Sequence, residues 1–179
     1  MKNDAGILDS DTSATALGKA RARLDPRFPG DEGIGVTSIL LSSIGVELDS
    51  DPLTGAEPQT AHQMIVRAWQ RYVEALAADR PLVALIEDLH WADPRLLDLV
   101  EAIAARATGV TLLLCMARPE LFERRPGWGG GVANTTAIVL SPLSAGDGAA
   151  LIEHLLDGQA PAEIVGPILH RSEGNPFFA

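Results

Sequence analysis

The chain has 179 residues, of which 46% are hydrophobic and 21% charged, so it has the apolar content of a globular domain and is not a disordered protein. A formal net charge of -10, from 14 basic and 24 acidic residues, argues against direct binding of nucleic acid or of an anionic membrane. The single cysteine, Cys115, excludes an internal disulfide, and no stretch approaches the roughly 20 apolar residues that span a bilayer. These features predict a cytoplasmic protein.

Residues 1–58 predict a loosely organised N-terminal segment of short helices and connectors. Residues 15–23 and 36–44 favour two helices, the second ended by Gly45 as a C-cap, and a connector rich in proline and glycine separates them. No apolar strand is indicated in this part of the sequence.

Residues 59–179 predict an α/β core. A long helix is expected over residues 60–78, where Ala61, Ile65, Ala68, Tyr72 and Leu76 share one face. The apolar run at 82–86, a helix at 94–107 and a second apolar run at 110–117 indicate a βαβ unit. Because both runs are apolar at every position, we expect parallel strands that are covered on both faces.

The rest of the predicted core follows in chain order. A third strand is expected within residues 132–140, and helices at 144–156 and 162–171. The loop before the third strand is rich in glycine and predicts a flexible connection. Arg124 and Arg125 precede that loop and could contact an anion or simply be solvated.

Two neighbouring carboxylates, Glu87 and Asp88, stand where the first predicted strand ends, within the sequence LVALIEDLHWADP. Ligands of open α/β sheets bind outside the carboxyl ends of the strands. One acid at such a place can hold a hydrated magnesium ion while its neighbour orients an attacking water. The structural alternative is that both residues cap the turn after the strand.

This segment resembles the Walker B region of the STAND branch of the AAA-related P-loop ATPases, and three later sequences continue the resemblance: ARPE at 117–120, LSPL at 140–143 and SEGNPFF at 172–178. The match covers about residues 60–179 well and 15–50 weakly. It is closest to the ATPase module of large bacterial regulators, found beside class III adenylate cyclase or LuxR-type helix-turn-helix domains. The resemblance implies a layered parallel sheet and a nucleotide-linked switch in signalling or transcription.

The resemblance also implies roles for individual residues. Glu87 would coordinate magnesium through water, Asp88 would orient the attacking water, and Arg118 would sense the γ-phosphate of ATP. The adenine side of the nucleotide would be formed by Gly174, Asn175 and Pro176.

Three further residues of the motif have structural readings. Trp91 is expected to be a packing anchor, and Asp93 to cap the helix that begins at Pro94. For His90, a structural and a functional role are equally open.

The Walker A sequence G-x-x-x-x-G-K-[ST] is absent from the chain. The nearest approach is Gly18-Lys19, but Ala20 replaces the hydroxyl residue and Ser13 replaces the first glycine. We therefore expect a partial P-loop NTPase fold that begins after its own P-loop strand, as a split or truncated protein does. Binding of ATP and Mg2+ should be impaired, and the natural partner would be the missing N-terminal P-loop fragment or another protein.

The missing strand has a consequence for the sheet, because in relatives it lies between the strands predicted at 110–117 and 136–140. These two segments should either pair directly or leave an open edge that favours association. The alternative function is an interaction module that binds no nucleotide, or a gene remnant. Whether the chain acts as an enzyme is left open by the sequence.

Overall fold

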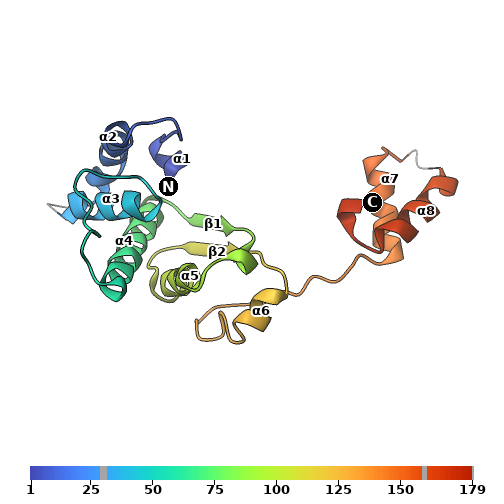
Figure 1. Ribbon diagram of the computed structural model, residues 1–179. Helices are drawn as coiled ribbons and strands as arrows, with labels where there is room; N and C mark the ends of the chain where they lie inside the picture. Colours follow the sequence, from blue (N-terminus) through green and yellow to red (C-terminus); the bar gives the residue numbers. More distant parts are fainter. Residues whose placement is uncertain (29–31, 159–160, 179) are drawn as a thin grey trace. The chain divides into compact units, whose positions relative to one another are not determined.

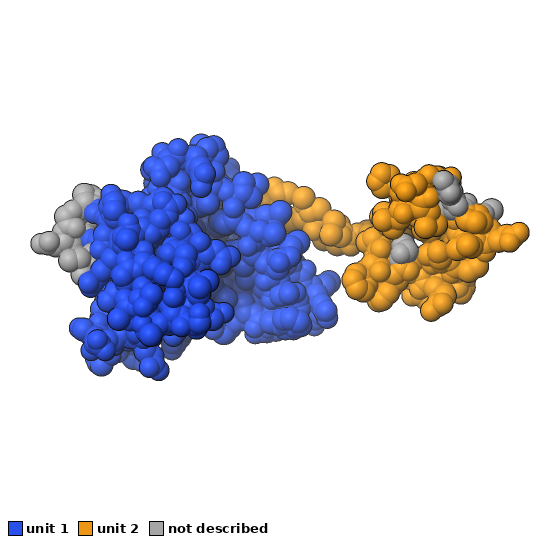
Figure 2. Space-filling view, turned by 90° about the horizontal axis from the view of Figure 1, so that it is seen from above, with its two compact units in different colours: residues 1–135 blue, residues 136–179 orange. Residues whose placement is uncertain are grey.

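The first structural unit begins with helices, as the ribbon shows (Figure 1). The structure is a computed structural model that describes residues 1–28, 32–158 and 161–178. It divides into two units, Met1–Thr135 and Thr136–Ala179, which are coloured separately in Figure 2 and are described one at a time below.

Among the described residues, four α-helices and one 3-10 helix precede the sheet of the first unit: α1 (Lys2–Ala5), α2 (Ser13–Leu24), η1 (Asp25–Arg27), α3 (Glu32–Ser43) and α4 (Pro58–Asp79). The helices predicted at 15–23, 36–44 and 60–78 are confirmed, although α3 begins four residues earlier than expected. The Thr12 side chain caps α2 by accepting from the amide of Thr15. Gly45 follows α3 with φ 81°, as its predicted capping role requires.

These helices share one apolar core. Leu24 of α2, Leu40 and Leu41 of α3, and Tyr72 of α4 are all buried in it. Residues 1–58 therefore pack against the long helix of the predicted core, and the structure divides the chain between Thr135 and Thr136.

The predicted βαβ unit is confirmed. Strands β1 (Leu82–Ile86) and β2 (Thr111–Cys115) pair in parallel, with Leu82 opposite Thr111 and Ile86 opposite Cys115. Helix α5 (Pro94–Arg106) connects them, and the short helix α6 (Glu120–Arg124), which the sequence did not predict, follows β2. The fold is thus α/β, with a two-stranded parallel sheet and flanking helices.

The expectation that both faces of this sheet are covered is wrong. One face contributes Ile86 and Cys115 to a core with Leu97 and Val100 of α5. The opposite face exposes four apolar side chains by 49 to 65%, namely Val83, Leu85, Leu112 and Leu114. Apolar composition predicted burial, but no element of the described chain packs on this face.

The third strand predicted within 132–140 is also wrong. Residues 132–134 form a bend and a turn, and residues 135–140 pair with no strand in the described ranges. Ile138, Val139 and Leu140 are 79 to 88% exposed. A strand needs a neighbour for its backbone groups, so β-branched composition alone does not form one. Within the described ranges the sheet consists of β1 and β2.

The second unit contains α7 (Ala145–Leu155), α8 (Ala162–Ser172) and the short η3 (Pro176–Phe178). Both predicted helices are confirmed. Ser144 caps α7, because its side chain accepts from the amide of Asp147. Across the described ranges of both units, every helix is too short or too polar to cross a membrane.

Replacing Leu112 and Leu114 by threonine should reduce concentration-dependent self-association. Threonine keeps the strand propensity of β2 while removing apolar surface from the exposed face. Sedimentation velocity over a range of protein concentrations measures the change. Leu113→Thr, on the half-buried face, is the control and should lower stability without lowering association. A parent chain that stays monomeric at every concentration would contradict this prediction.

Asp4→Asn should lower the free energy of unfolding by about 1 kcal/mol at neutral pH. Asp4 accepts hydrogen bonds from Arg23 (2.9 Å) and from the Tyr72 hydroxyl (3.2 Å). Partial burial raises the pKa of Asp4, but the hydrogen bond and charge of Arg23 outweigh it, so the pKa lies below its ordinary value.

Because the folded-state pKa is depressed, this stabilisation is complete above the unfolded-state pKa and disappears as the pH falls through the folded value. Urea unfolding of parent and variant should therefore converge in acid. Asp9→Asn is the control, since the Lys2–Asp9 pair leaves Asp9 93% exposed and should contribute less than about 0.5 kcal/mol. Equal effects of the two substitutions would count against the prediction.

Candidate functional site

The two strands bring their carboxyl ends to the same edge of the sheet, because they run in parallel. Glu87 and Asp88 follow β1, and residues 116–118 follow β2. Met116 joins the two segments: its amide donates to the Ile86 carbonyl at 2.8 Å, and its carbonyl accepts from the Leu89 amide at 3.1 Å. The acidic pair is thus held in a short turn whose two ends both bond to Met116.

Asp88 makes the turn possible through its backbone. Its φ of 55° and ψ of 31° lie in the left-handed region, which aspartate tolerates better than most residues with a side chain. The chain then enters the 3-10 helix η2 (Leu89–Trp91), and Leu89 is buried in the core beneath it. This reversal leaves both carboxylates exposed while the residue after them is anchored.

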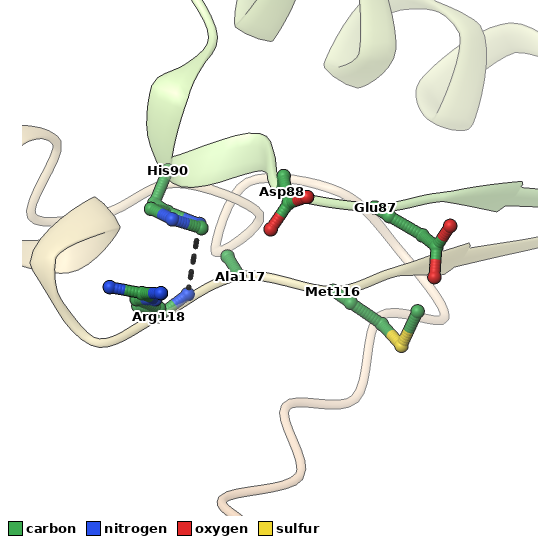
Figure 3. Close-up of a pocket in the computed structure, with 6 residues that line it drawn as sticks. All are labelled: Glu87, Asp88, His90, Met116, Ala117 and Arg118. Atoms are coloured by element: carbon green, nitrogen blue, oxygen red, sulfur yellow. Dashed lines mark hydrogen bonds between the residues drawn. The ribbon is translucent and has the colours of Figure 1, made fainter.

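A hollow of about 260 Å3 lies at this edge, and Figure 3 shows the six residues that line it: Glu87, Asp88, His90, Met116, Ala117 and Arg118. The structure therefore brings together three residues that the sequence singled out, Glu87, Asp88 and Arg118. In Figure 3, Asp88 lies between Glu87 and the His90–Arg118 pair. Their catalytic and binding roles stay predictions.

The donor set fits part of a nucleotide site. Magnesium in proteins keeps several waters and takes one or two carboxylates together with phosphate oxygens. Among the described residues, no group of three or more His, Cys, Asp or Glu side chains could hold a metal by itself. The hollow is also below the ~300–1,000 Å3 of most small-molecule pockets. Two carboxylates and one guanidinium group line it, so a bound metal ion would need further oxygens from a ligand.

The HWADP residues of the motif have distinct environments. His90 is buried, with 6% of its surface exposed, whereas Trp91 is 72% exposed, so the prediction that Trp91 is a packing anchor is wrong. The core of this region is formed by Leu97 and Val100 of α5 together with Leu89 and Leu121, and the indole is not part of it. Asp93 is confirmed as the cap of α5, because its carboxylate accepts from the amides of Arg95 and Leu96.

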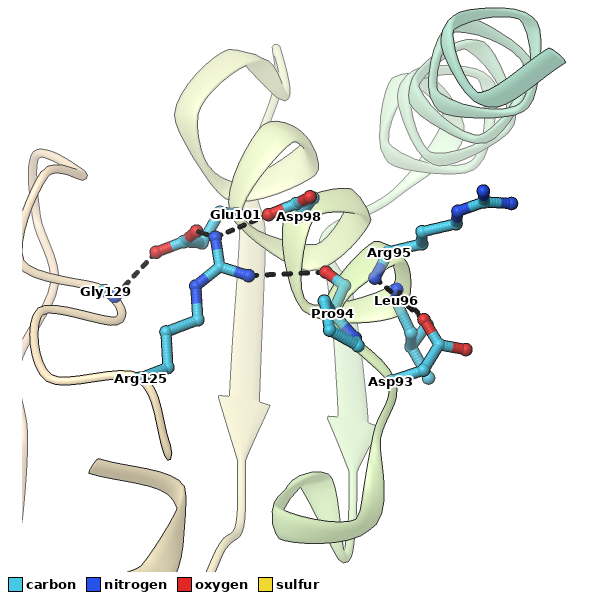
Figure 4. A network of polar contacts seen from close by, with 8 residues as sticks. All are labelled: Asp93, Pro94, Arg95, Leu96, Asp98, Glu101, Arg125 and Gly129. Carbon is cyan, nitrogen blue, oxygen red and sulfur yellow. Dashed lines mark hydrogen bonds and ion pairs between the residues drawn. The ribbon is translucent and has the colours of Figure 1, made fainter. Parts of the chain in front are cut away.

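Arg125 is bound to α5 and is not free to hold an anion. Its guanidinium donates to Asp98, to Glu101 and to the Pro94 carbonyl, as Figure 4 shows. The hydrogen bond to Asp98 is the main reason that the pKa of Arg125 is raised. The Glu101 carboxylate also accepts from the amide of Gly129, so the glycine-rich loop is tied to α5 at this point.

Arg124 is engaged in the same way. Its guanidinium donates to the carbonyls of His90 and Ala92, which ties α6 to the turn that carries the acidic pair. Sequence reasoning missed both arginines as positioning groups. Their partners are backbone carbonyls and acids about 25 to 35 residues away, which no local pattern identifies.

Lys19, the nearest approach to a P-loop lysine, lies inside helix α2. Its ammonium group pairs with Asp11 at 2.7 Å. A phosphate-binding loop needs successive backbone amides that face the ligand, and the amides of a helix interior are already bonded. The Gly18-Lys19 pair therefore has a structural role here.

The residues predicted for the adenine side belong to the second unit. Gly174, with φ 78°, accepts from the Leu143 amide at 2.8 Å, which joins the LSPL and SEGNPFF sequences. A Cβ atom at Gly174 would stand 2.6 Å from the Leu143 carbonyl oxygen. Asn175 accepts from the Phe177 amide, and Pro176 begins η3. This packing explains Gly174 structurally, and the adenine contact stays a prediction.

Comparison with known proteins identifies a relative of this chain by sequence similarity. An uncharacterized protein of Rhizobium meliloti (strain 1021) is 34% identical over 111 residues, which are 62% of this chain and 10% of that protein. The part of the relative that aligns with this chain is thus a small segment of a much longer protein. No family profile matches the chain, and no solved structure matches it.

Gly174→Ala should destabilise the second unit by more than about 1 kcal/mol, since alanine is strained at positive φ and would collide with the Leu143 backbone. The matched control is Gly146→Ala in the first turn of α7, where the nearest atom to an added Cβ is the Ser144 hydroxyl at 3.8 Å and a helical alanine should stabilise by about 0.5–1 kcal/mol. Hydrogen exchange of the Leu143 amide measures both effects. Parent-like protection in Gly174→Ala would contradict the structural role.

Proposed function

We propose that this chain is a partial regulatory ATPase domain of the STAND type, which supplies the magnesium- and water-handling side of a nucleotide-linked switch. One observation carries the proposal. Glu87, Asp88 and Arg118 come from the ends of two adjacent parallel strands and line one hollow. Opposite charges at the carboxyl edge of such a sheet are suited to a metal ion and a phosphate group together.

In this proposal each of the three residues has a separate task. Glu87 helps to hold hydrated magnesium, Asp88 orients the water that attacks the γ-phosphate, and Arg118 offers positive charge to that phosphate. Bound magnesium would neutralise negative charge on the phosphate oxygens. Gly174, Asn175 and Pro176 would contact the adenine, and the switch would act in signalling or transcription.

The phosphate cradle is the component that these residues do not supply. The sequence has no Walker A motif, and Lys19 is paired within a helix. Backbone amides and a lysine for the phosphates must therefore come from another polypeptide segment, which is the partner that we propose.

A second candidate function, a protein-interaction module without nucleotide, is favoured by a different observation. The sheet face formed by Val83, Leu85, Leu112 and Leu114 is apolar and exposed. Exposed apolar surface of this kind commonly marks a binding site for another protein.

The 179-residue chain alone should bind MgATP weakly and hydrolyse none above background. A ligand that binds only the folded state with a Kd near ~1 mM adds only about 0.4 kcal/mol of stability at an equal ligand concentration. Calorimetric titration and phosphate release measure the two properties. A melting shift of several degrees at low millimolar MgATP would contradict the expectation.

Fusion to a P-loop-bearing segment tests the proposed roles. Binding of MgATP should be restored, and Glu87→Ala should then weaken it. Asp88→Asn should leave binding largely intact and abolish hydrolysis, because orienting the water matters in the transition state. Asparagine also tolerates the left-handed backbone of position 88, so the turn is preserved.

Glu120→Ala on α6 is the control for loss of an exposed acid outside the hollow and should match the parent fusion. If the fusion binds MgATP while the Glu87 and Asp88 variants both behave like the control, the acidic pair is structural. A fusion that folds and still binds no nucleotide favours the interaction module.

A further inference from the structure

His90 makes one polar contact through its imidazole ring, and that contact is to the backbone of Arg118. The Arg118 amide donates to Nδ1 of His90 at 3.4 Å, as the dashed line in Figure 3 shows. A backbone amide can only donate, so Nδ1 carries no proton, and the neutral ring bears its proton on Nε2. The contact therefore favours this tautomer of His90.

The other ring nitrogen of His90 lowers the stability of the folded chain. Nε2 of His90 is buried and has no hydrogen-bond partner within the described ranges. A buried donor without an acceptor is destabilising. Leucine would fill similar space at position 90 without that penalty, so packing alone does not account for a histidine. The feature that histidine supplies and leucine lacks is the acceptor for the Arg118 amide.

A second set of contacts reaches the side chain of the same arginine. The ring of His90 lies 4.8 Å from the ring of Trp91, and the guanidinium carbon of Arg118 lies 6.0 Å from the Trp91 ring centre. The latter distance is at the outer limit of cation–π attraction. The ring of the exposed Trp91 thus lies near both the buried histidine and the arginine side chain.

The position of His90 itself is fixed from two sides. Its carbonyl accepts from the guanidinium of Arg124 on α6, and its neighbour Leu89 is bonded to Met116 and buried. The ring is consequently held against residues 116–118, the segment after β2 that includes Arg118.

From this geometry we infer that His90 is a positioning residue for Arg118: its ring accepts from the arginine backbone and lies beside the Trp91 ring, which the guanidinium of Arg118 approaches. The inference rests on the proposed function for its purpose, since an arginine needs a fixed place only if it meets a phosphate. The positioning itself is a property of the chain and can be measured without nucleotide.

The test uses the full chain and two variants, His90→Asn and His90→Leu. The side-chain oxygen of asparagine can take the place of Nδ1 as acceptor, whereas leucine offers none. In His90→Leu, hydrogen exchange of the Arg118 amide should quicken about tenfold or more relative to the Met116 amide, whose partner is the Ile86 carbonyl. His90→Asn should retain most of the protection.

The ring-nitrogen signals of His90 in an NMR spectrum of the parent provide an independent reading. The expected signature is the tautomer with the proton on Nε2, and a proton on Nδ1 overturns the inference. Unchanged Arg118 protection in His90→Leu also overturns it. If Met116 loses protection in His90→Leu as well, the turn has opened, and the Asn variant decides: protection retained supports the inference and protection lost overturns it.

Titration with millimolar MgATP tests whether the positioning of Arg118 serves nucleotide binding. It should shift the Arg118 signals of the parent and of His90→Asn more than those of His90→Leu. Equal shifts in all three proteins overturn the link between His90 and the site. If no protein responds to MgATP, alone or after fusion to a P-loop segment, the proposed function fails, while the exchange and tautomer measurements still decide the positioning.

Discussion

The backbone hydrogen bonds of Met116 hold the candidate site together. They connect Ile86 and Leu89, the residues on either side of the acidic pair, to the segment that leads into Arg118. Each such bond contributes only about 0.5–1.5 kcal/mol net. Their importance is geometric, because they place side chains from two strands around one hollow.

Several contacts from outside the sheet reinforce this arrangement. Asp93 caps α5 immediately after the turn, Arg124 ties α6 to the turn, and Arg125 ties the chain after α6 to α5. His90 is buried beside this turn, and its ring accepts from the Arg118 amide. The residues predicted to do chemistry thus remain exposed, while the residues that orient them are buried or bonded.

Two apolar features of the structure lack partners in the described chain: one face of the β1–β2 sheet and the extended residues 136–140. An element of another polypeptide segment packed on the exposed face would cover it, and residues 136–140 would need a neighbouring strand to become one. The proposed ATPase needs such a segment for its phosphate cradle, and the interaction module needs one as its partner. The measurements on the fused chain distinguish the two, since only the first couples the partner to nucleotide.

The sequence by itself determined most helices, the two strands, their parallel crossover and the position of Glu87 and Asp88 at a strand end. These depend on local periodicity and caps such as Asp93, which a sequence displays directly. Only the tertiary structure decided that Trp91 is exposed, that residues 136–140 form no strand, and that Arg125 is bound to α5. Burial, strand pairing and long-range ion pairs depend on which surfaces meet, and an apolar or charged residue does not specify its partner.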